Sequence, residues 1–186
     1  MKPIGHTEKF FKEIKDELKK GSTQKTHPFR YFTLGTVGLD RFVRQRTVVL
    51  RDFSEDLKCS FYTDFRSKKI IHIKENNKVG LLFYDPEKLL QIKIEGLATI
   101  IKGAAKEQEH GQNIPEQSRK EYTTALAPGT PLKDAAPLEY LNEENHFCVV
   151  EVTPFKIEYL KLQQPEHIRV RFSNRDDLWS GEFLVP

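Results

Sequence analysis

The chain has 186 residues, 38% of them hydrophobic and 11% aromatic, which is enough for a packed core and excludes an intrinsically disordered protein. Charged residues make up 31%, yet the net charge is only +3 because lysines and glutamates are interspersed, which argues against a nucleic-acid partner. The cysteines, Cys59 and Cys148, lack metal-ligand spacing, and no run of about 20 apolar residues could span a membrane. We expect one cytoplasmic domain over 1–186, without a metal.

The first predicted element is an amphipathic helix over residues 7–20. Apolar residues recur at helical spacing from Phe10 to Leu18, and two lysines followed by Gly21 suit its end.

From residue 29 the apolar pattern changes to a period of two, which indicates strands. The predicted strands are 29–38, 42–53, 57–63, 78–84, 89–101, 146–162, 167–173 and 178–186. The segment 103–145 is polar and is expected to be a loop insertion with one helix, PEQSRKEYTTAL. So many short antiparallel strands favour a mainly β fold, a barrel with flanking helices, over a parallel sheet.

The stretch FYTDFRSKK suits an anion. A strand ends near Thr63, and Ser67 can cap a helix that begins with Lys68 and Lys69. The first turn of a helix carries unpaired N–H groups and partial positive charge, to which a hydroxyl and two ammonium groups are added here. The alternative is that both lysines are solvated surface residues.

Three further polar residues stand on predicted strands. In RQRTVVLRDF, alternation places Arg46 and Arg51 on opposite faces, and both could be solvated residues of a barrel rim. In LLQIKIEG, Gln91 lies on the face opposite Leu90 and Ile92. Its amide could pair with a heteroaromatic ring or make a cross-strand contact.

Four stretches in order, RTVVLRDF, FYTDFRSKK, NNKVGLLFY and LLQIKIEGLA, resemble the pyridoxamine 5'-phosphate oxidase-like family of FMN-binding split barrels. The resemblance covers 29–101 well, returns more weakly after Phe147, and is poor over 103–145. It implies a six-stranded antiparallel split barrel and a homodimer with FMN at the subunit interface.

The resemblance also implies a set of FMN-binding residues. Arg46, Lys68 and Lys69 would lie near the phosphate, and Gln91 would reach the isoalloxazine ring. The full set is Arg46, Thr47, Val48, Val49, Leu50, Arg51, Tyr62, Thr63, Ser67, Lys68, Lys69, Gln91 and Arg171.

The substrate side of the family site departs from the pattern. Leu160 stands where the oxidase has a tryptophan, and no clear counterpart of its substrate-phosphate helix occurs in QSRKEYTTALAPG. We therefore expect an FMN-dependent oxidoreductase acting on an unidentified small molecule. The alternatives are pyridoxamine or pyridoxine 5'-phosphate oxidation itself, or a non-catalytic flavin- or haem-binding split barrel. Tyr122, His167 and Arg169 are candidate acid–base residues, none of them assigned.

Overall fold

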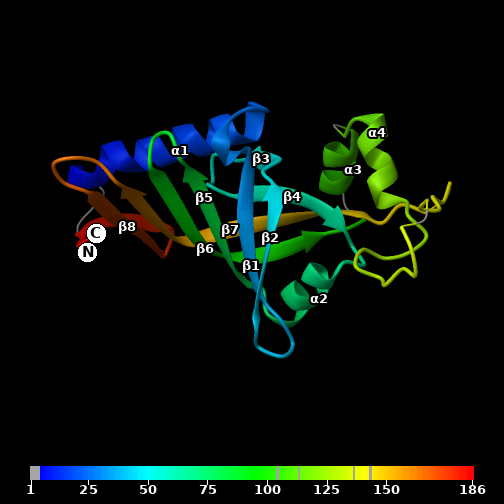
Figure 1. The fold of residues 1–186 in the computed structure, drawn as a ribbon. Coiled ribbons are helices and arrows are strands. Elements are labelled where there is room, and N and C mark those ends of the chain that lie inside the picture. Colours follow the sequence, from blue (N-terminus) through cyan, green and yellow to red (C-terminus); the bar gives the residue numbers. More distant parts are fainter. Residues whose placement is uncertain (1–4, 104, 113, 136, 143) are drawn as a thin grey trace.

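The computed structural model describes residues 5–103, 105–112, 114–135, 137–142 and 144–186 (Figure 1). The helical elements are η1 Gly5–Thr7, α1 Glu8–Thr23, η2 Pro28–Arg30, α2 Lys68–Glu75, α3 Ala105–Gln112, α4 Glu116–Arg119 and η3 Lys120–Tyr122. The strands are β1 Tyr31–Val37, β2 Val43–Val49, β3 Asp52–Phe53, β4 Cys59–Asp64, β5 Lys78–Asp85, β6 Leu90–Ile101, β7 Phe147–Lys161, β8 Ile168–Arg175 and β9 Leu178–Leu184.

All nine strands of the described residues form one antiparallel sheet. Seven follow the order β2-β1-β5-β6-β7-β4-β3, while β8 pairs with β7 and β9 pairs with β8. The mainly β prediction with flanking helices is confirmed, but the closed six-stranded barrel is wrong: the sheet is open and has more strands. The ends of the seven-strand path are nevertheless chain neighbours, because only Leu50 and Arg51 separate β2 from β3. The N–H of Arg51 donates to the Ser60 carbonyl of β4 at 2.8 Å.

The sheet has more than six strands because the long strand β7 pairs with different partners along its length. Its first half pairs with β4 and its second half with β8, while β6 runs along both halves. The register of the β6–β7 ladder shifts between Glu95 and Gly96, where a bulge bends the strands. A Cβ at Gly96 would lie 2.6 Å from Val152 and 2.7 Å from the Thr153 carbonyl, so the close approach requires glycine.

The N-terminal helix α1 covers one side of the sheet (Figure 1). Phe10, Phe11, Ile14 and Leu18 are buried in the main core, as the helical spacing predicts. The helix runs to Thr23, three residues beyond the predicted end, because the glycine expected to stop it lies inside the helix. That glycine packs on Phe29, whose Cβ would be 2.8 Å from an added methyl group.

The segment 103–145 contains more helix than predicted. Its first helix, α3, falls where a loop was expected. The predicted helix PEQSRKEYTTAL is only partly helical: Pro115 is the N-cap rather than a first-turn residue, and a 3-10 turn follows α4. The segment rests on a small core of its own, formed by Ile114, Tyr122, Phe147 and Val149.

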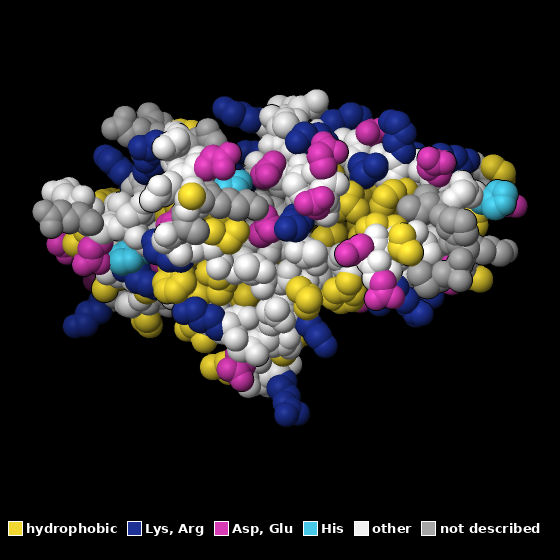
Figure 2. Space-filling model, turned by 180° about the vertical axis from the view of Figure 1, so that it is seen from behind, with side chains coloured by type: hydrophobic (Ala, Val, Ile, Leu, Met, Phe, Trp, Pro, Cys, Tyr) yellow, Lys and Arg dark blue, Asp and Glu magenta, His cyan; other side chains and the backbone are white. Residues whose placement is uncertain are grey.

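Two surface properties follow from the composition. On the face drawn in Figure 2, basic and acidic side chains are interspersed, in keeping with the small net charge. Within the described ranges, no helix is long and apolar enough to cross a membrane. Cys59 and Cys148 are both buried free thiols.

Candidate functional site

The junction between β4 and α2 brings three predicted site residues together. Thr63 lies near the end of β4, Ser67 is the N-cap of α2, and Lys69 is in its first turn. The turn between them is fixed by Asp64, whose carboxylate accepts the N–H of Arg66 at 2.7 Å and whose carbonyl accepts the N–H of Ser67 at 3.1 Å. An aspartate at this place therefore ends the strand and starts the helix.

Lys69 turns back over this junction. Its Nζ donates to the Thr63 hydroxyl at 2.8 Å and to the Ser67 hydroxyl at 3.3 Å, and the two hydroxyl oxygens are 3.3 Å apart. Ser67 does not use its side chain to cap the helix. Both hydroxyls are buried, so an ammonium group and two hydroxyls converge in front of the first turn of α2.

Arg46 reaches the same region from β2. Arg46 shares the inward face of the strand with the buried Val48, two residues further on. The guanidinium Nη1 donates to the Thr36 hydroxyl at 2.7 Å and to the Leu34 carbonyl at 3.3 Å. Thr36 and Leu34 belong to β1, so this neighbouring strand holds the arginine.

The electrostatics of the cluster call for an anion. Burial, and then the charge of Arg46, lowers the pKa of Lys69, while burial also lowers the pKa of Arg46. Asp64 acts on Lys69 by charge, but its carboxylate is already paired with Arg66 at 2.8 Å. Within the described part of the chain, no carboxylate forms an ion pair with Lys69 or Arg46. Two partly buried like charges without a counter-ion fit a phosphate group.

Lys68 differs from Lys69, although both lysines were predicted to lie near the phosphate. Its side chain is exposed, and it acts on His72 through its charge. It makes no hydrogen bond or ion pair to any residue that the structure describes. The geometry therefore favours Lys69 over Lys68 as a ligand of the anion.

Arg51 and Tyr62 form a second group away from this cluster. The Arg51 guanidinium lies over the Tyr62 ring, 5.2 Å from its centre, and the Tyr62 hydroxyl lies 2.9 Å from His110 Nδ1. The Arg51 Nε is buried and has no hydrogen-bond partner among the described residues. The pKa of Tyr62 is raised, chiefly by burial, so this tyrosine is neutral at pH 7.

The remaining predicted residues are spread over the sheet. Thr47, Val48 and Val49 belong to β2 and Leu50 follows its last residue; Val48 and Leu50 are buried. Gln91 lies on the outward face of β6, opposite Tyr84 of β5, and its neighbours Leu90 and Ile92 are buried as predicted.

Arg171 is committed to a carboxylate rather than to the cluster. Its Nε and Nη2 donate to Glu182 of β9 at 3.1 and 2.9 Å. Within one chain, the structure therefore brings neither Gln91 nor Arg171 to Arg46 and Lys69.

The candidate acid–base residues are engaged elsewhere. His167 accepts the N–H of Gln163 at 3.1 Å, and Arg169 pairs with Glu158 at 2.9 Å. Tyr122 is buried in the small core of the 103–145 segment, and burial raises its pKa to about 12.

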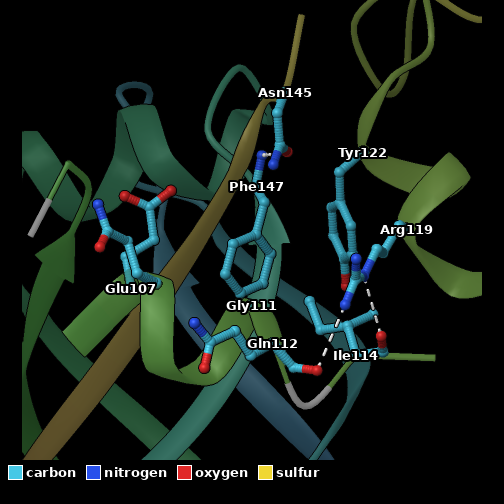
Figure 3. A pocket seen from close by; sticks show the side chains of 9 residues that line it. Glu107, Gly111, Gln112, Ile114, Arg119, Tyr122, Asn145 and Phe147 are labelled. Atoms are coloured by element: carbon cyan, nitrogen blue, oxygen red, sulfur yellow. Dashed lines mark hydrogen bonds between the residues drawn. The ribbon is translucent and has the colours of Figure 1, made fainter. Parts of the chain in front are cut away.

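A hollow of about 470 Å³ opens in the segment 103–145 (Figure 3). Its lining includes the apolar side chains of Ile114, Tyr122 and Phe147. Arg119 lies at its edge, where Nε and Nη2 donate to the carbonyls of Ile114 and Gln112 at 3.1 and 3.3 Å. This arginine holds the backbone of the segment together.

Sequence reasoning missed Thr36 and His72. Thr36 is 1% exposed and contacts both Arg46 Nη1 and His72 Nδ1. A signal was present, because Thr36 alternates with Phe32 and Leu34 on the inward face of a strand, where a hydroxyl needs a partner.

The chain is similar to known proteins in both sequence and structure. The family model for the pyridoxamine 5'-phosphate oxidase, FMN-binding domain, matches residues 7–102. A pyridoxine/pyridoxamine 5'-phosphate oxidase of Zymomonas mobilis is 27% identical over 194 residues, covering 96% of this chain and 97% of that protein. One from Flavobacterium johnsoniae is 34% identical over 96 residues, which are 52% of this chain and 42% of that protein.

Solved structures share the fold. A pyridoxamine 5'-phosphate oxidase-related, FMN-binding protein from Nostoc punctiforme superposes with a TM-score of 0.76 at 23% identity, over 95% of this chain and 97% of that one. PhzG from Burkholderia lata, solved with tetrahydrophenazine-1-carboxylic acid, has a TM-score of 0.72 at 15% identity and covers 98% and 92% of the two chains. The family match includes Arg46 and the β4–α2 junction but stops before 103–145.

Proposed function

Because this chain belongs to the pyridoxamine 5'-phosphate oxidase family and carries its FMN-binding domain, we propose that it is an FMN-dependent oxidoreductase acting on a small molecule. Bound FMN would supply the redox chemistry, since its ring accepts a hydride and passes electrons to an acceptor. The chain would act as one domain that binds the cofactor and orients it.

The observation that carries the proposal is a pair of cations, Arg46 and Lys69, for which the described part of the chain supplies no counter-ion. Arg46 and Lys69 would bind the FMN phosphate, and the hydroxyls of Thr63 and Ser67 would add hydrogen bonds. The free N–H groups of the first turn of α2 lie in the same place. A phosphate would neutralise two groups that at present repel each other.

The ring of FMN would extend toward the outward-facing residues of the site. Arg51 is five residues beyond Arg46 and follows the end of β2, so at most roughly 18 Å of extended chain separates the two positions. That span suits an extended nucleotide with its phosphate at Arg46. The Arg51 Nε is buried and has no hydrogen-bond partner within the described ranges, which supports a ligand on that side, the flavin or its substrate.

We propose as well that two copies form a homodimer through the outward face of β1, β2 and β5. A hollow of about 330 Å³ lies over Gly35 and Gly80 on this face. The exposed apolar side chains around it are Tyr31, Val43, Leu82 and Tyr84. Gln91 and Arg171 lie outward as well, so a second copy would offer the flavin residues that one chain keeps apart.

Two measurements test this proposal. The absorption spectrum of the purified protein, reconstituted with FMN, should show the bands of a bound flavin; haem bands would favour the haem-binding alternative. Sedimentation should give a dimer at micromolar concentration, because a stable interface of this kind buries about 2,000 Å² or more. A flavin-loaded monomer would overturn the dimer and leave the cofactor assignment standing.

The activity of the named relatives is the second candidate. The match to the Zymomonas mobilis enzyme extends over nearly the whole chain, which favours pyridoxine or pyridoxamine 5'-phosphate as substrate. The FMN-loaded protein, supplied with either compound and oxygen, should then form pyridoxal 5'-phosphate. Absence of that product with bound FMN intact would leave another small molecule as the substrate.

A further inference from the structure

A buried hydrogen-bond chain stands behind Arg46. Arg46 Nη1 donates to the Thr36 hydroxyl at 2.7 Å, and this hydroxyl lies 3.0 Å from His72 Nδ1. Thr36 is 1% exposed and His72 is 9% exposed. The three residues come from β1, β2 and α2, so the chain of contacts crosses three elements.

The chemistry of the three groups orders the hydrogens. A guanidinium can only donate, so the Thr36 oxygen is the acceptor toward Arg46. When the neutral His72 ring carries its hydrogen on Nε2, the single hydroxyl hydrogen of Thr36 points at His72 Nδ1, which accepts it. Burial, followed by the charge of Arg46, lowers the pKa of His72, so the ring is neutral near pH 7 and has an acceptor nitrogen.

The same chain of contacts links the two cations of the site. His72 is three residues after Lys69 on α2, which places both on one side of the helix. Arg46 is on β2, and Thr36 is the only described residue that hydrogen-bonds to both Arg46 and His72. Arg46 and Lys69 repel each other, so a contact is needed that holds β2 and α2 together when no anion lies between the two cations.

We propose that Thr36 and His72 are positioning residues: they hold the Arg46 guanidinium at a fixed distance from Lys69, so that the site is prepared for the phosphate of FMN. This inference rests on the proposed function. It assigns a ligand-directed role to a buried threonine and a buried histidine. A purely structural contact would affect folding and would not distinguish FMN from riboflavin, which lacks the phosphate.

The experiment compares two matched substitutions at residue 36. Thr36→Val has the same shape without the hydroxyl, whereas Thr36→Ser keeps it. Thr36→Val should weaken FMN binding about fivefold, the typical effect of one hydrogen bond, and leave riboflavin binding unchanged. Thr36→Ser should bind FMN like the wild type. Fluorescence titration with each flavin measures both constants without relying on turnover.

A double-substitution cycle with Arg46 separates positioning from a general effect. If Thr36 acts through Arg46, Thr36→Val should cause no further loss in an Arg46→Gln background. An equal loss in both backgrounds, or an equal loss for FMN and riboflavin, overturns the inference. If Arg46→Gln alone lowers FMN affinity and Thr36→Val does not, only the positioning role fails. If Arg46→Gln leaves FMN affinity unchanged, the proposed phosphate site fails as well.

His72 offers a second pair of variants should Thr36→Val fold poorly. An Asn side chain can place its amide oxygen near the position of Nδ1, so His72→Asn should retain most of the preference for FMN over riboflavin. His72→Leu fills the space without an acceptor. Its preference for FMN over riboflavin should fall as much as that of Thr36→Val. Equal behaviour of the two His72 variants would contradict the role of the acceptor nitrogen.

Discussion

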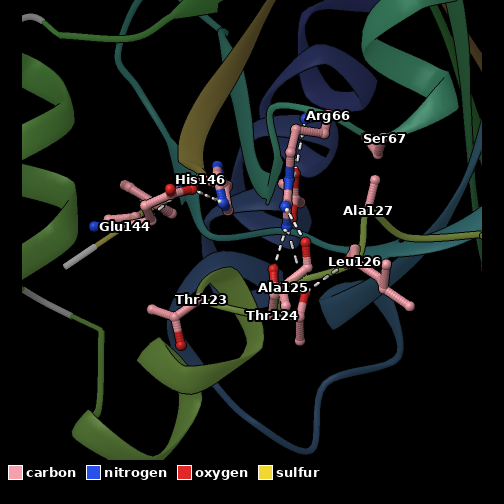
Figure 4. Close-up of polar contacts among 12 residues, drawn as sticks. Arg66, Ser67, Thr123, Thr124, Ala125, Leu126, Ala127, Glu144 and His146 are labelled. Carbon is pink, nitrogen blue, oxygen red and sulfur yellow. Dashed lines mark hydrogen bonds and ion pairs between the residues drawn. The ribbon is translucent and has the colours of Figure 1, made fainter. Parts of the chain in front are cut away.

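Arg66 and Lys69 are three residues apart, yet the fold treats their charges in opposite ways. Arg66 is saturated: it pairs with Asp64 at 2.8 Å and donates to the carbonyls of Thr124 and Ala125 at 2.8 and 3.2 Å (Figure 4). Among the residues that the structure describes, Lys69 hydrogen-bonds to the hydroxyls of Thr63 and Ser67 alone.

Their pKa values shift in opposite directions for the same reason. The hydrogen bond to Asp64 raises the pKa of Arg66, whereas burial and then Arg46 lower the pKa of Lys69. A cation saturated within the chain holds structure together, here the loop around Thr124. A partly buried cation with no counter-ion among the described residues is suited to hold a ligand.

The largest effect is expected from Arg66→Met. Asp64 is 4% exposed and would remain buried without its partner, so the free energy of unfolding should fall by about 3 kcal/mol. Urea unfolding measures this loss. Asp64→Asn combined with Arg66→Met should recover part of it, because the buried charge is then removed. A wild-type unfolding curve for Arg66→Met would contradict the structural role of Arg66 and thus its contrast with Lys69.

Lys69→Gln should weaken FMN binding and leave stability almost unchanged, the opposite of Arg66→Met. A hydrogen bond to a charged group contributes about 1.5–3 kcal/mol, so FMN affinity should fall roughly tenfold to a hundredfold. Riboflavin affinity and the free energy of unfolding should stay close to wild type. Lys68→Gln is the matched control, and it should lower FMN affinity much less because Lys68 is exposed. Equal losses for the two lysines would contradict the geometry.

Tyr62→Phe tests how the 103–145 segment is held. It removes the hydroxyl that contacts His110 Nδ1 at 2.9 Å, which should destabilise α3 locally by about 1 kcal/mol. Faster amide hydrogen exchange in α3, with unchanged exchange in β6, would be the sign. His110→Ala should have the same effect, and the double variant no larger one. Unchanged exchange in both would mean that other contacts hold the helix.

The smallest effect concerns salt. The preference for FMN over riboflavin should shrink a few-fold as ionic strength rises from about 0.1 M to 1 M, since the screening length falls from roughly 10 Å to 3 Å. Flavin titrations at both salt concentrations measure it. A preference that does not change with salt would indicate that the phosphate is recognised without exposed charge.

The parts of the fold that follow local patterns could be predicted. Alternation placed Arg46 and the buried Val48 on one face of β2, and the spacing of Phe10 to Leu18 predicted the buried side of α1. The strand pairing could not be predicted, because the two partners of β7 depend on a bulge opposite Gly96. The open sheet therefore replaced the expected closed barrel.

The site shows the same division. The hydroxyls and lysines of FYTDFRSKK pointed to an anion because their spacing is local. That Lys69 turns inward while Lys68 faces solvent depends on how α2 packs against the sheet. Thr36 and His72 are 36 residues apart and meet only in the folded chain, so no sequence pattern could pair them.

In the proposed site, Arg46 and Lys69 together bind the phosphate of FMN. The most direct test is the ratio of the dissociation constants of riboflavin and FMN, measured by fluorescence titration for the wild type and for Arg46→Gln/Lys69→Gln. We predict a large ratio for the wild type and a ratio near 1 for the double variant, with riboflavin affinity preserved. A double variant that keeps the wild-type ratio would contradict the account.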